Sequence, residues 1–240
     1  MHFHLPKPLH GWRALVGEVG IIVVGVLIAL AAEQAVESWH WHEKVRSAER
    51  SLDFEVNVQL DNAEGEVALN RCAGPYLDAL ETAIVRHDSA GIQKLYDADP
   101  PYQARAWRST AWQSVMSTHV ADHMDASAMA QYGFIFNDAE VARDLQKAMV
   151  PDFGEAMLGR LGGPATPDST ALQLAAAERL RSDLQEVKGT SAAMLIAARG
   201  GLHPGWKPIE RKRAPHLEEE VRRDLQSCES AANAAGKRKS

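Results

Sequence analysis

The longest apolar run of the chain lies near its N-terminus. Every residue from Val19 to Ala32 is Val, Ile, Leu, Ala or Gly. As a helix this run is about 21 Å long, at about 1.5 Å per residue, whereas a bilayer core needs about 20 apolar residues. Extending the helix back to Ala14 supplies the missing length and places Glu18 at the membrane boundary. The pattern predicts one membrane-spanning helix, with interfacial flanks, over residues 14–39.

Tryptophans stand on both sides of this run. Trp12 precedes it and Trp39 follows it, with Trp41 two residues further on. Positions 12 and 39 are about 40 Å apart on a straight helix, which matches the thickness of a bilayer with its headgroups. Trp side chains prefer these two interfaces. We therefore expect Trp12, Trp39 and Trp41 to anchor the helix at the membrane surfaces.

Two other structures also fit the apolar run. A secretory signal peptide has a basic start, a short apolar region and an A-x-A-like cleavage site, and Ala29-Leu30-Ala31 has that form. Helix-forming residues continue past Ala31, which favours an uncleaved anchor over a cleaved signal. A buried helix of a soluble domain is the third alternative, because the charge-free run is shorter than a full span.

Apolar positions continue beyond the run at helical spacing. Steps of three and four residues place them on one face of a helix, with charged residues between them. The pattern predicts that the membrane helix continues as an amphipathic stalk over residues 40–66. This stripe either docks on the chain's own domain, which we favour, or forms a coiled coil. Its members are Val45, Ala48, Leu52, Val56, Leu60, Ala63 and Val67.

The rest of the chain is also helical in pattern. No convincing alternation of apolar and polar residues predicts a strand, so we expect an all-α fold with a helical bundle over residues 67–200. Asp99-Pro100-Pro101 and the stretch from Gly162 to Pro167 should separate helices, because proline disfavours helical geometry in the residue before it. The expected helices cover residues 67–86, 92–96, 105–123, 126–137, 138–161, 168–198 and 218–230. Asn137 or Asp138 is the expected cap of the fifth.

Charge sets the expected orientation and excludes one class of partner. The 240-residue chain has a formal net charge of -6, which argues against a nucleic-acid-binding protein. Lys7 and Arg13 precede the span, while Glu33, Glu37 and Glu43 follow it before any cation. Cations near a span remain in the cytoplasm. We expect a bacterial inner-membrane protein with residues 1–13 in the cytoplasm and the large C-terminal part in the periplasm.

The two cysteines give a second prediction about the compartment. Cys72 and Cys228 both follow the span, and the periplasm is an oxidising environment in which disulfides persist. A bridge between them would fix residues 201–240, which we expect to contain an irregular segment, a short helix and a basic tail, to the bundle. The alternative is two unpaired thiols, as expected if the domain faced the cytoplasm.

The anchor helix resembles a known family. Gly17-Glu18-Val19 and the stretch Gly25–Leu30 form the pattern G-E-[IV]-x(5)-G-[IV]-L-I-A-L. This pattern resembles that of a widespread family of uncharacterised bacterial single-pass membrane proteins, and the Ser109-Thr110-Ala111-Trp112 stretch also looks like that group. The match is close over the anchor and loose elsewhere, and Trp39 comes later than in the family. The resemblance implies a membrane anchor and an extracytoplasmic helical domain, and it implies no activity.

Glu18 is an unusual residue at a membrane boundary. A carboxylate there indicates a function or a partner, and small residues on its helix face allow a second helix to approach closely. We expect a helix–helix interface, and hence a possible homo-oligomer, unless Glu18 simply lies among the headgroups near Arg13. The residues of this interface are Glu18, Ile22, Gly25, Ala29 and Ala32.

The sequence contains no motif of a known catalytic, metal or cofactor site. His119 and His123 have the i, i+4 spacing of metal ligands on a helix, with Asp122 and Asp125 nearby, but Val120 replaces the Glu of an H-E-x-x-H motif. We predict no catalytic residues, no cofactor and no metal ligand. The favoured function is a non-catalytic periplasmic protein that binds an envelope protein or a ligand. The alternative is an enzyme whose site combines distant residues such as His119 and His123.

Overall fold

The computed structural model describes residues 11–98, 105–206 and 226 of the chain. These residues form helices joined by short irregular segments, without any strand in the described ranges, which confirms the all-α prediction for them. The helices are α1 (Gly11–Val85), α2 (Ser89–Asp97), α3 (Thr110–Met116), α4 (Ala126–Ala156) and α5 (Pro167–Ala198), with the 3₁₀ turns η1 (Ala121–His123) and η2 (Leu158–Leu161).

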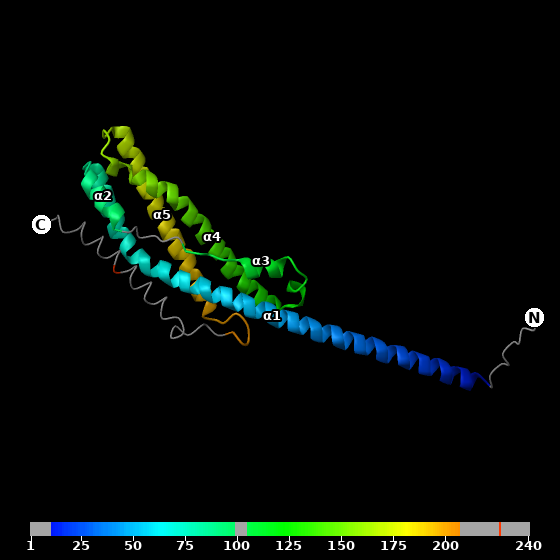
Figure 1. Ribbon diagram of the computed structural model, residues 1–240. Helices are drawn as coiled ribbons and strands as arrows, with labels where there is room; N and C mark the ends of the chain where they lie inside the picture. Colours follow the sequence, from blue (N-terminus) through cyan, green and yellow to red (C-terminus); the bar gives the residue numbers. More distant parts are fainter. Residues whose placement is uncertain (1–10, 99–104, 207–225, 227–240) are drawn as a thin grey trace, which may run out of the picture.

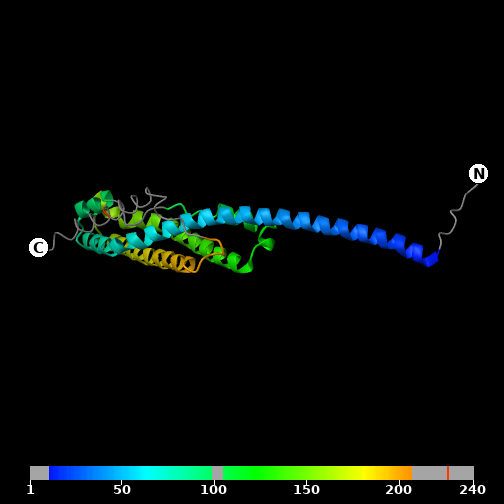
Figure 2. The same cartoon turned by 90° about the horizontal axis from the view of Figure 1, so that it is seen from below.

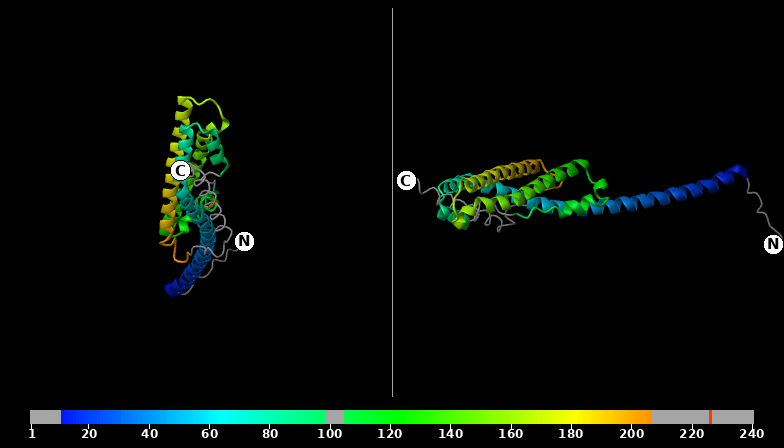
Figure 3. Two further views of the ribbon diagram at one scale, coloured as in Figure 1. Left: turned by 90° about the vertical axis from the view of Figure 1, so that its left-hand side faces the viewer. Right: turned by 90° about the horizontal axis from the view of Figure 1, so that it is seen from above.

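Helix α1 joins two very different environments. Its first part, residues 11–40, projects from the rest of the described structure as a rod with no other element beside it (Figures 1, 2 and 3). Every side chain described in this part is exposed. The second part of α1 lies in the bundle, where α5 packs along both α1 and α4 (Figure 1).

Helix α1 is longer than the sequence pattern predicts. We expected an interruption near Gly65 and a separate helix over residues 67–86, but one helix runs through Gly65 and Pro75 to Val85. Proline removes one backbone hydrogen bond and bends a helix without always ending it, and α1 curves toward α2 in this region (Figure 1). Packing against the bundle keeps the helix continuous, so the expected boundary between stalk and bundle is not a break in secondary structure.

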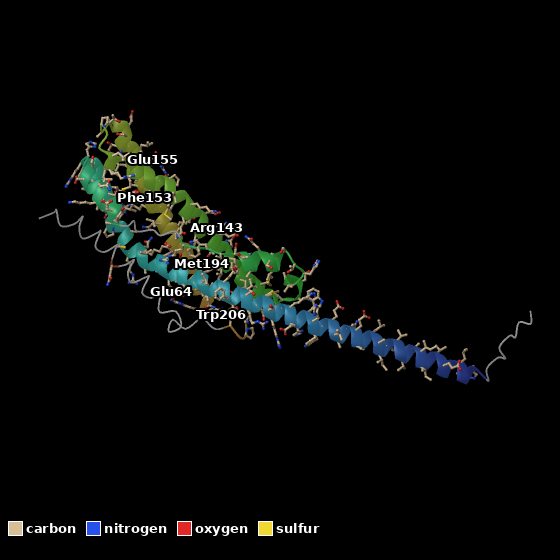
Figure 4. The ribbon with its side chains drawn as sticks, viewed as in Figure 1. Glu64, Arg143, Phe153, Glu155, Met194 and Trp206 are labelled. Carbon is tan, nitrogen blue, oxygen red and sulfur yellow. The ribbon has the colours of Figure 1, made fainter. Side chains whose placement is uncertain are left out.

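The apolar stripe of α1 docks on the chain's own bundle, as favoured from the sequence. Leu52, Val56 and Ala63 are fully buried in the cluster nearer the projecting rod, which also contains Tyr132 and Phe136 of α4. Met194 of α5 and the partly buried Trp206, labelled in Figure 4, belong to the same cluster. A second cluster fills the far end of the bundle between the end of α1, α2, α4 and α5; its largest members include Tyr76, Leu80, Ile92, Met149 and Leu180.

Three predicted helices were wrong in their extent. The expected helix over residues 105–123 is reduced to α3, because residues 105–109 have no helical structure and a turn follows Met116. The expected helices over 126–137 and 138–161 are one helix, α4, and Asp125 rather than Asn137 or Asp138 is its N-cap, accepting a hydrogen bond from the Ala128 amide at 2.9 Å.

Other boundaries agree with the sequence. α2 covers the predicted helix at residues 92–96, and Asp88 caps it by accepting from the Gly91 amide at 2.9 Å. α5 begins at Pro167 behind a capping box formed by Thr166 and Ser169. The chain turns at Gly201, which has a φ of 80°. The predicted last helix at residues 218–230 and the basic tail lie outside the described residues, apart from Gln226.

Candidate functional site

A polar stripe on α1 holds the segment that follows α2. The side chains of Glu55, Gln59, Asn62 and Glu66 recur at steps of four, three and four residues, so they share one helix face beside the apolar stripe. Glu55 Oε2 accepts a hydrogen bond from the Ala111 amide at 2.8 Å. Gln59 Nε2 donates to the carbonyl oxygen of Arg108, and Asn62 Nδ2 donates to that of Ala106 at 3.3 Å.

The stripe ends in a buried ion pair. Arg105 Nε lies 2.9 Å from Glu66 Oε1, and the two side chains are only 8% and 2% exposed. Gln146 of α4 completes the cluster: its Nε2 donates to Glu66 at 3.0 Å, and its Oε1 accepts from Trp107 Nε1 at 2.9 Å. Because buried charges require partners, these contacts fix residues 105–109 in an irregular, non-helical path beside α1 and α4.

Gly65 makes room for the Arg105 side chain. A β-carbon at position 65 would lie 2.5 Å from one guanidinium nitrogen of Arg105, closer than real β-carbons approach any atom. The helical backbone at Gly65 does not require glycine, so the small residue serves the close approach of Arg105. The predicted helix break at this position therefore marks a packing requirement instead.

A groove lies beside the polar stripe, between α1 and the segment that contains α3. Its volume is about 980 Å³, at the upper end of the range for small-molecule sites. Phe54, which is 62% exposed, contributes an aromatic surface. Apolar side chains also supply much of the rest of the lining: Ala48, Val58, Ala106, Ala111, Val115 and Val120. The polar groups among them are the cations Lys44, Arg50 and Arg108, the carboxylate of Glu55, the amide of Asn62, and the hydroxyls of Ser47, Ser51, Thr110, Ser114 and Thr118.

The charged residues that line this groove are mostly cations, whereas the whole chain is net negative. Three cations and one carboxylate line it, although the whole chain has a formal net charge of -6. The Glu55 carboxylate already accepts the Ala111 amide proton. Arg50 faces Glu43 at 3.7 Å, with both side chains mostly exposed, and such a pair contributes little. The groove therefore presents an excess of positive charge.

A second polar cluster joins α1, α4 and the end of α5. Asp53 Oδ1 accepts a hydrogen bond from the Tyr132 hydroxyl at 2.6 Å, and Asp53 lies 3.1 Å from His203 Nε2. Burial and, after it, the hydrogen bond to Asp53 raise the pKa of the Tyr132 phenol, so the phenol stays protonated and remains a donor. This cluster ties the segment after α5 to α1.

The histidines proposed as an alternative site do not form one. His119 lies in the turn after α3, is largely exposed, and faces Asp122 at 3.3 Å. His123 instead stacks on Trp41, with ring centroids 3.9 Å apart. The two residues do not share one helix, as the spacing had predicted. Among the described residues no group of three or more His, Cys, Asp or Glu side chains is placed to hold a metal ion.

Trp41 is thus part of the bundle surface as well as a predicted interfacial anchor. Besides His123 it contacts Lys44, whose Nζ lies 4.4 Å from the ring centroid. A smaller cavity of about 410 Å³ lies beside this stack. Trp12 and Trp39, the two predicted anchors nearest the apolar run, are each 73% exposed.

The predicted helix–helix interface is uncovered within the chain. Glu18, Ile22, Gly25, Ala29 and Ala32 are all exposed on the projecting part of α1, and α1 is the one described helix long and apolar enough to cross a membrane.

The predicted disulfide stays a prediction. Cys72 is buried in α1 beside Leu69, and its Sγ lies 3.1 Å from the Leu69 carbonyl oxygen. Cys228 lies outside the described residues.

Sequence reasoning missed Arg105, Glu66, Gln146 and the cations of the groove. A polar pattern at helical spacing was visible in the sequence at Glu55, Gln59, Asn62 and Glu66. A polar face on a helix ordinarily faces water, however, so this pattern did not indicate a buried site. The partners of these residues are 39 to 56 residues away along the chain, and no local pattern indicates such pairs.

Comparison with other proteins adds no relative. No protein-family model, no curated protein and no solved structure matches the chain. The function must therefore be inferred from the molecule's own residues.

Proposed function

We propose that this protein is a membrane-anchored binding protein whose helical bundle lies in the periplasm and has no catalytic activity of its own. The observation that carries the proposal is the division of α1. Its first part exposes the apolar run from Val19 to Ala32, and its second part lines the groove. An apolar helix surface of this length is stable in a bilayer and unfavourable in water.

The orientation follows from charge. Lys7 and Arg13 precede the apolar run, and acidic residues follow it, so the positive-inside rule favours a cytoplasmic N-terminus. The bundle begins near Trp41, only nine residues after Ala32. At about 1.5 Å per residue this is about 14 Å, so the bundle stands close to the outer membrane surface. N-terminal sequencing tests whether the anchor is retained; a mature protein that begins at Ala32 would contradict it.

The groove supports binding over catalysis. Its lining combines hydroxyls, an amide and cations around Phe54, which can orient a ligand by hydrogen bonds and charge. General acid–base catalysis needs a group that titrates near neutral pH within reach of the substrate, and no histidine lines the groove. The alternative enzyme built on His119 and His123 loses its support because their rings contact different partners.

The test is retention of a ligand by the full chain in detergent micelles. After incubation with the small-molecule fraction of a bacterial extract, mass spectrometry should find a molecule retained without chemical change. Binding should also raise the unfolding temperature, because a ligand stabilises the state that it binds. Ser114→Trp, which fills the groove, should abolish both effects, whereas Ser182→Trp on exposed α5 surface should not.

Two results would contradict this proposal. A retained molecule recovered in chemically altered form would favour the enzyme. Retention that Ser114→Trp leaves intact would show that the groove is not the binding site.

A homo-oligomer through the anchor is the second part of the proposal. Glu18 and the small residues of its face are exposed and uncovered within the chain, so a second copy can approach closely and bond to Glu18. In a membrane two-hybrid assay, Gly25→Leu or Ala29→Leu should weaken self-association. Val24→Leu lies on another face and should not; equal effects of all three would leave only a passive anchor.

A further inference from the structure

We propose that the groove between α1 and the α3 segment binds a small anion that carries several hydroxyl groups, such as a sugar phosphate or a sugar acid. This inference rests on the proposed binding function and names the chemistry of its ligand.

The charge of the groove supports an anionic ligand. Lys44, Arg50 and Arg108 line it against one carboxylate, Glu55. The positions of these groups place the cations along both walls: Lys44 and Arg50 are on α1, and Arg108 is on the segment before α3. No carboxylate in residues 11–98 or 105–206 pairs with the Arg108 guanidinium, so within these residues its donors are not taken by an acid and can bind an anion.

Glu55 is the one acid among the described residues that line the groove. Its Oε2 accepts the Ala111 amide proton; the bond leaves the carboxylate charged, so the three cations exceed it in number by two. The amide thus orients Glu55 toward the backbone of α3.

Hydroxyl side chains support a ligand with hydroxyl groups. Five Ser and Thr residues line the groove, on both α1 and the α3 segment. A hydroxyl can donate one hydrogen bond and accept two. Ser51 and Thr118 already donate to the backbone carbonyls of Ser47 and Val115, so toward a ligand they act as acceptors. With the other hydroxyls they can match a polyol, which presents donors and acceptors on the same carbon chain. Phe54, 62% exposed, offers an apolar face against which a sugar ring can stack.

The size and place of the groove favour a soluble small molecule. A volume of about 980 Å³ is within the range for small-molecule sites. Its cation nearest the membrane, Lys44, is twelve residues beyond Ala32, or about 18 Å along the helix. A headgroup layer is about 5–8 Å thick on each side of the hydrocarbon core. Lys44 contacts the predicted interfacial Trp41 and so lies near the outer edge of that layer, whereas Arg50 is eleven residues beyond Trp39, or about 16 Å along the helix, where a soluble molecule can reach it.

The experiment measures binding of defined probes to the full chain in micelles by isothermal titration calorimetry. Glucose 6-phosphate or glucuronate should bind saturably, and neutral glucose should bind at least about tenfold more weakly, because a hydrogen bond to a charged group contributes about 1.5 kcal/mol or more. Arg108→Gln should weaken binding of the anion about tenfold. Arg143→Gln, on exposed α4 surface where Arg143 pairs with Asp144, should leave it unchanged (Figure 4).

Four results would overturn the proposal. They are no saturable binding of either anion, equal binding of glucose, affinity unaffected by Arg108→Gln, and tighter binding of an acidic peptide such as hexaglutamate than of either sugar. A different result tests the proposed binding function itself. If a neutral molecule binds in the groove and Ser114→Trp abolishes it, the binding function stands and only the anionic ligand is wrong.

Discussion

The two parts of α1 differ in what surrounds their side chains. From Val19 to Ala32 the helix carries only apolar side chains, and all of them are exposed. From Leu52 to Glu66 the same helix buries an apolar stripe and, beside it, a polar one, each against other parts of the chain. The first part is long and apolar enough to cross a membrane, which is the environment that we propose for it. The second part needs specific partners, and its polar groups have them.

This difference predicts where single substitutions act. The exposed part should tolerate changes that keep it apolar, because no contact within the chain depends on any one residue there. In the buried part, removal of a single polar group should lower the stability of the fold, because a buried polar group that loses its partner is destabilising. The following substitutions test this contrast, all by chemical unfolding of the full chain in micelles.

The largest effect should come from breaking the buried ion pair. Arg105→Met leaves the Glu66 carboxylate buried without its cation, although Gln146 still donates to it, and removing one partner of a buried pair costs about 3–5 kcal/mol. Adding Glu66→Gln removes the uncompensated charge and should recover most of the loss. If Arg105→Met lowered the free energy of unfolding by less than about 1 kcal/mol, the usual contribution of an exposed ion pair, water would have to reach this cluster.

A matched pair of glycines gives the sharpest comparison between the two parts. Gly65→Ala forces Arg105 away from a β-carbon that would otherwise lie 2.5 Å from its guanidinium, and such overpacking costs about 1–3 kcal/mol. Gly25→Ala and Gly74→Ala meet no atom within 4 Å, and Ala is the better helix former. These two variants should be neutral or slightly stabilising; equal losses at Gly65 and Gly25 would remove the contrast.

The sequence predicted the exposed part of α1 well and the site poorly, for a physical reason. The apolar run and the stripe from Leu52 to Ala63 are periodic and local, so they can be recognised in one segment. The irregular segment of residues 105–109 was predicted as helix. Side chains of Glu66 and Gln146 determine its path from 39 and 41 positions away, and tertiary contacts of this kind override helix propensity.

The position of α4 shows the same limit. Asn137 and Asp138 were expected to cap a new helix, because short polar side chains favour helix starts. Both lie inside α4, where burial raises the pKa of Asp138. The true cap, Asp125, is as polar as either of them, and only the packing of Tyr132 and Phe136 shows that the helix starts before them.

A smaller loss should follow from removing the Tyr132 hydroxyl. Tyr132 is fully buried and donates to Asp53 at 2.6 Å, and a hydrogen bond to a charged group contributes about 1.5 kcal/mol or more. Tyr132→Phe should therefore destabilise the bundle by about that amount. Tyr96→Phe, at a residue that is 41% exposed, should change stability by less than about 0.5 kcal/mol. Similar losses in both variants would argue against a bonded Tyr132.

The smallest effect should be a gain. Burial and then the charge of Asp152 raise the pKa of Asp183 on α5, so its ionised form is less favourable in the folded state. Folding stability should fall as pH rises from the unfolded pKa to the higher folded pKa, and the penalty persists above it. Asp183→Asn should raise stability at pH 7 by less than about 1 kcal/mol and leave it unchanged below about pH 3.9. A gain that is equal at both pH values would contradict this origin.

The central claim is that the exposed part of α1 crosses the membrane and carries the bundle to the periplasm. Alkaline phosphatase fused behind the full chain, which is active only outside the cytoplasm, tests it most directly. The fusion should be active in a Gram-negative cell, and deletion of residues 19–32 should abolish that activity without preventing synthesis of the protein. An inactive phosphatase, together with an active cytoplasmic reporter at the same position, would contradict both the span and the orientation.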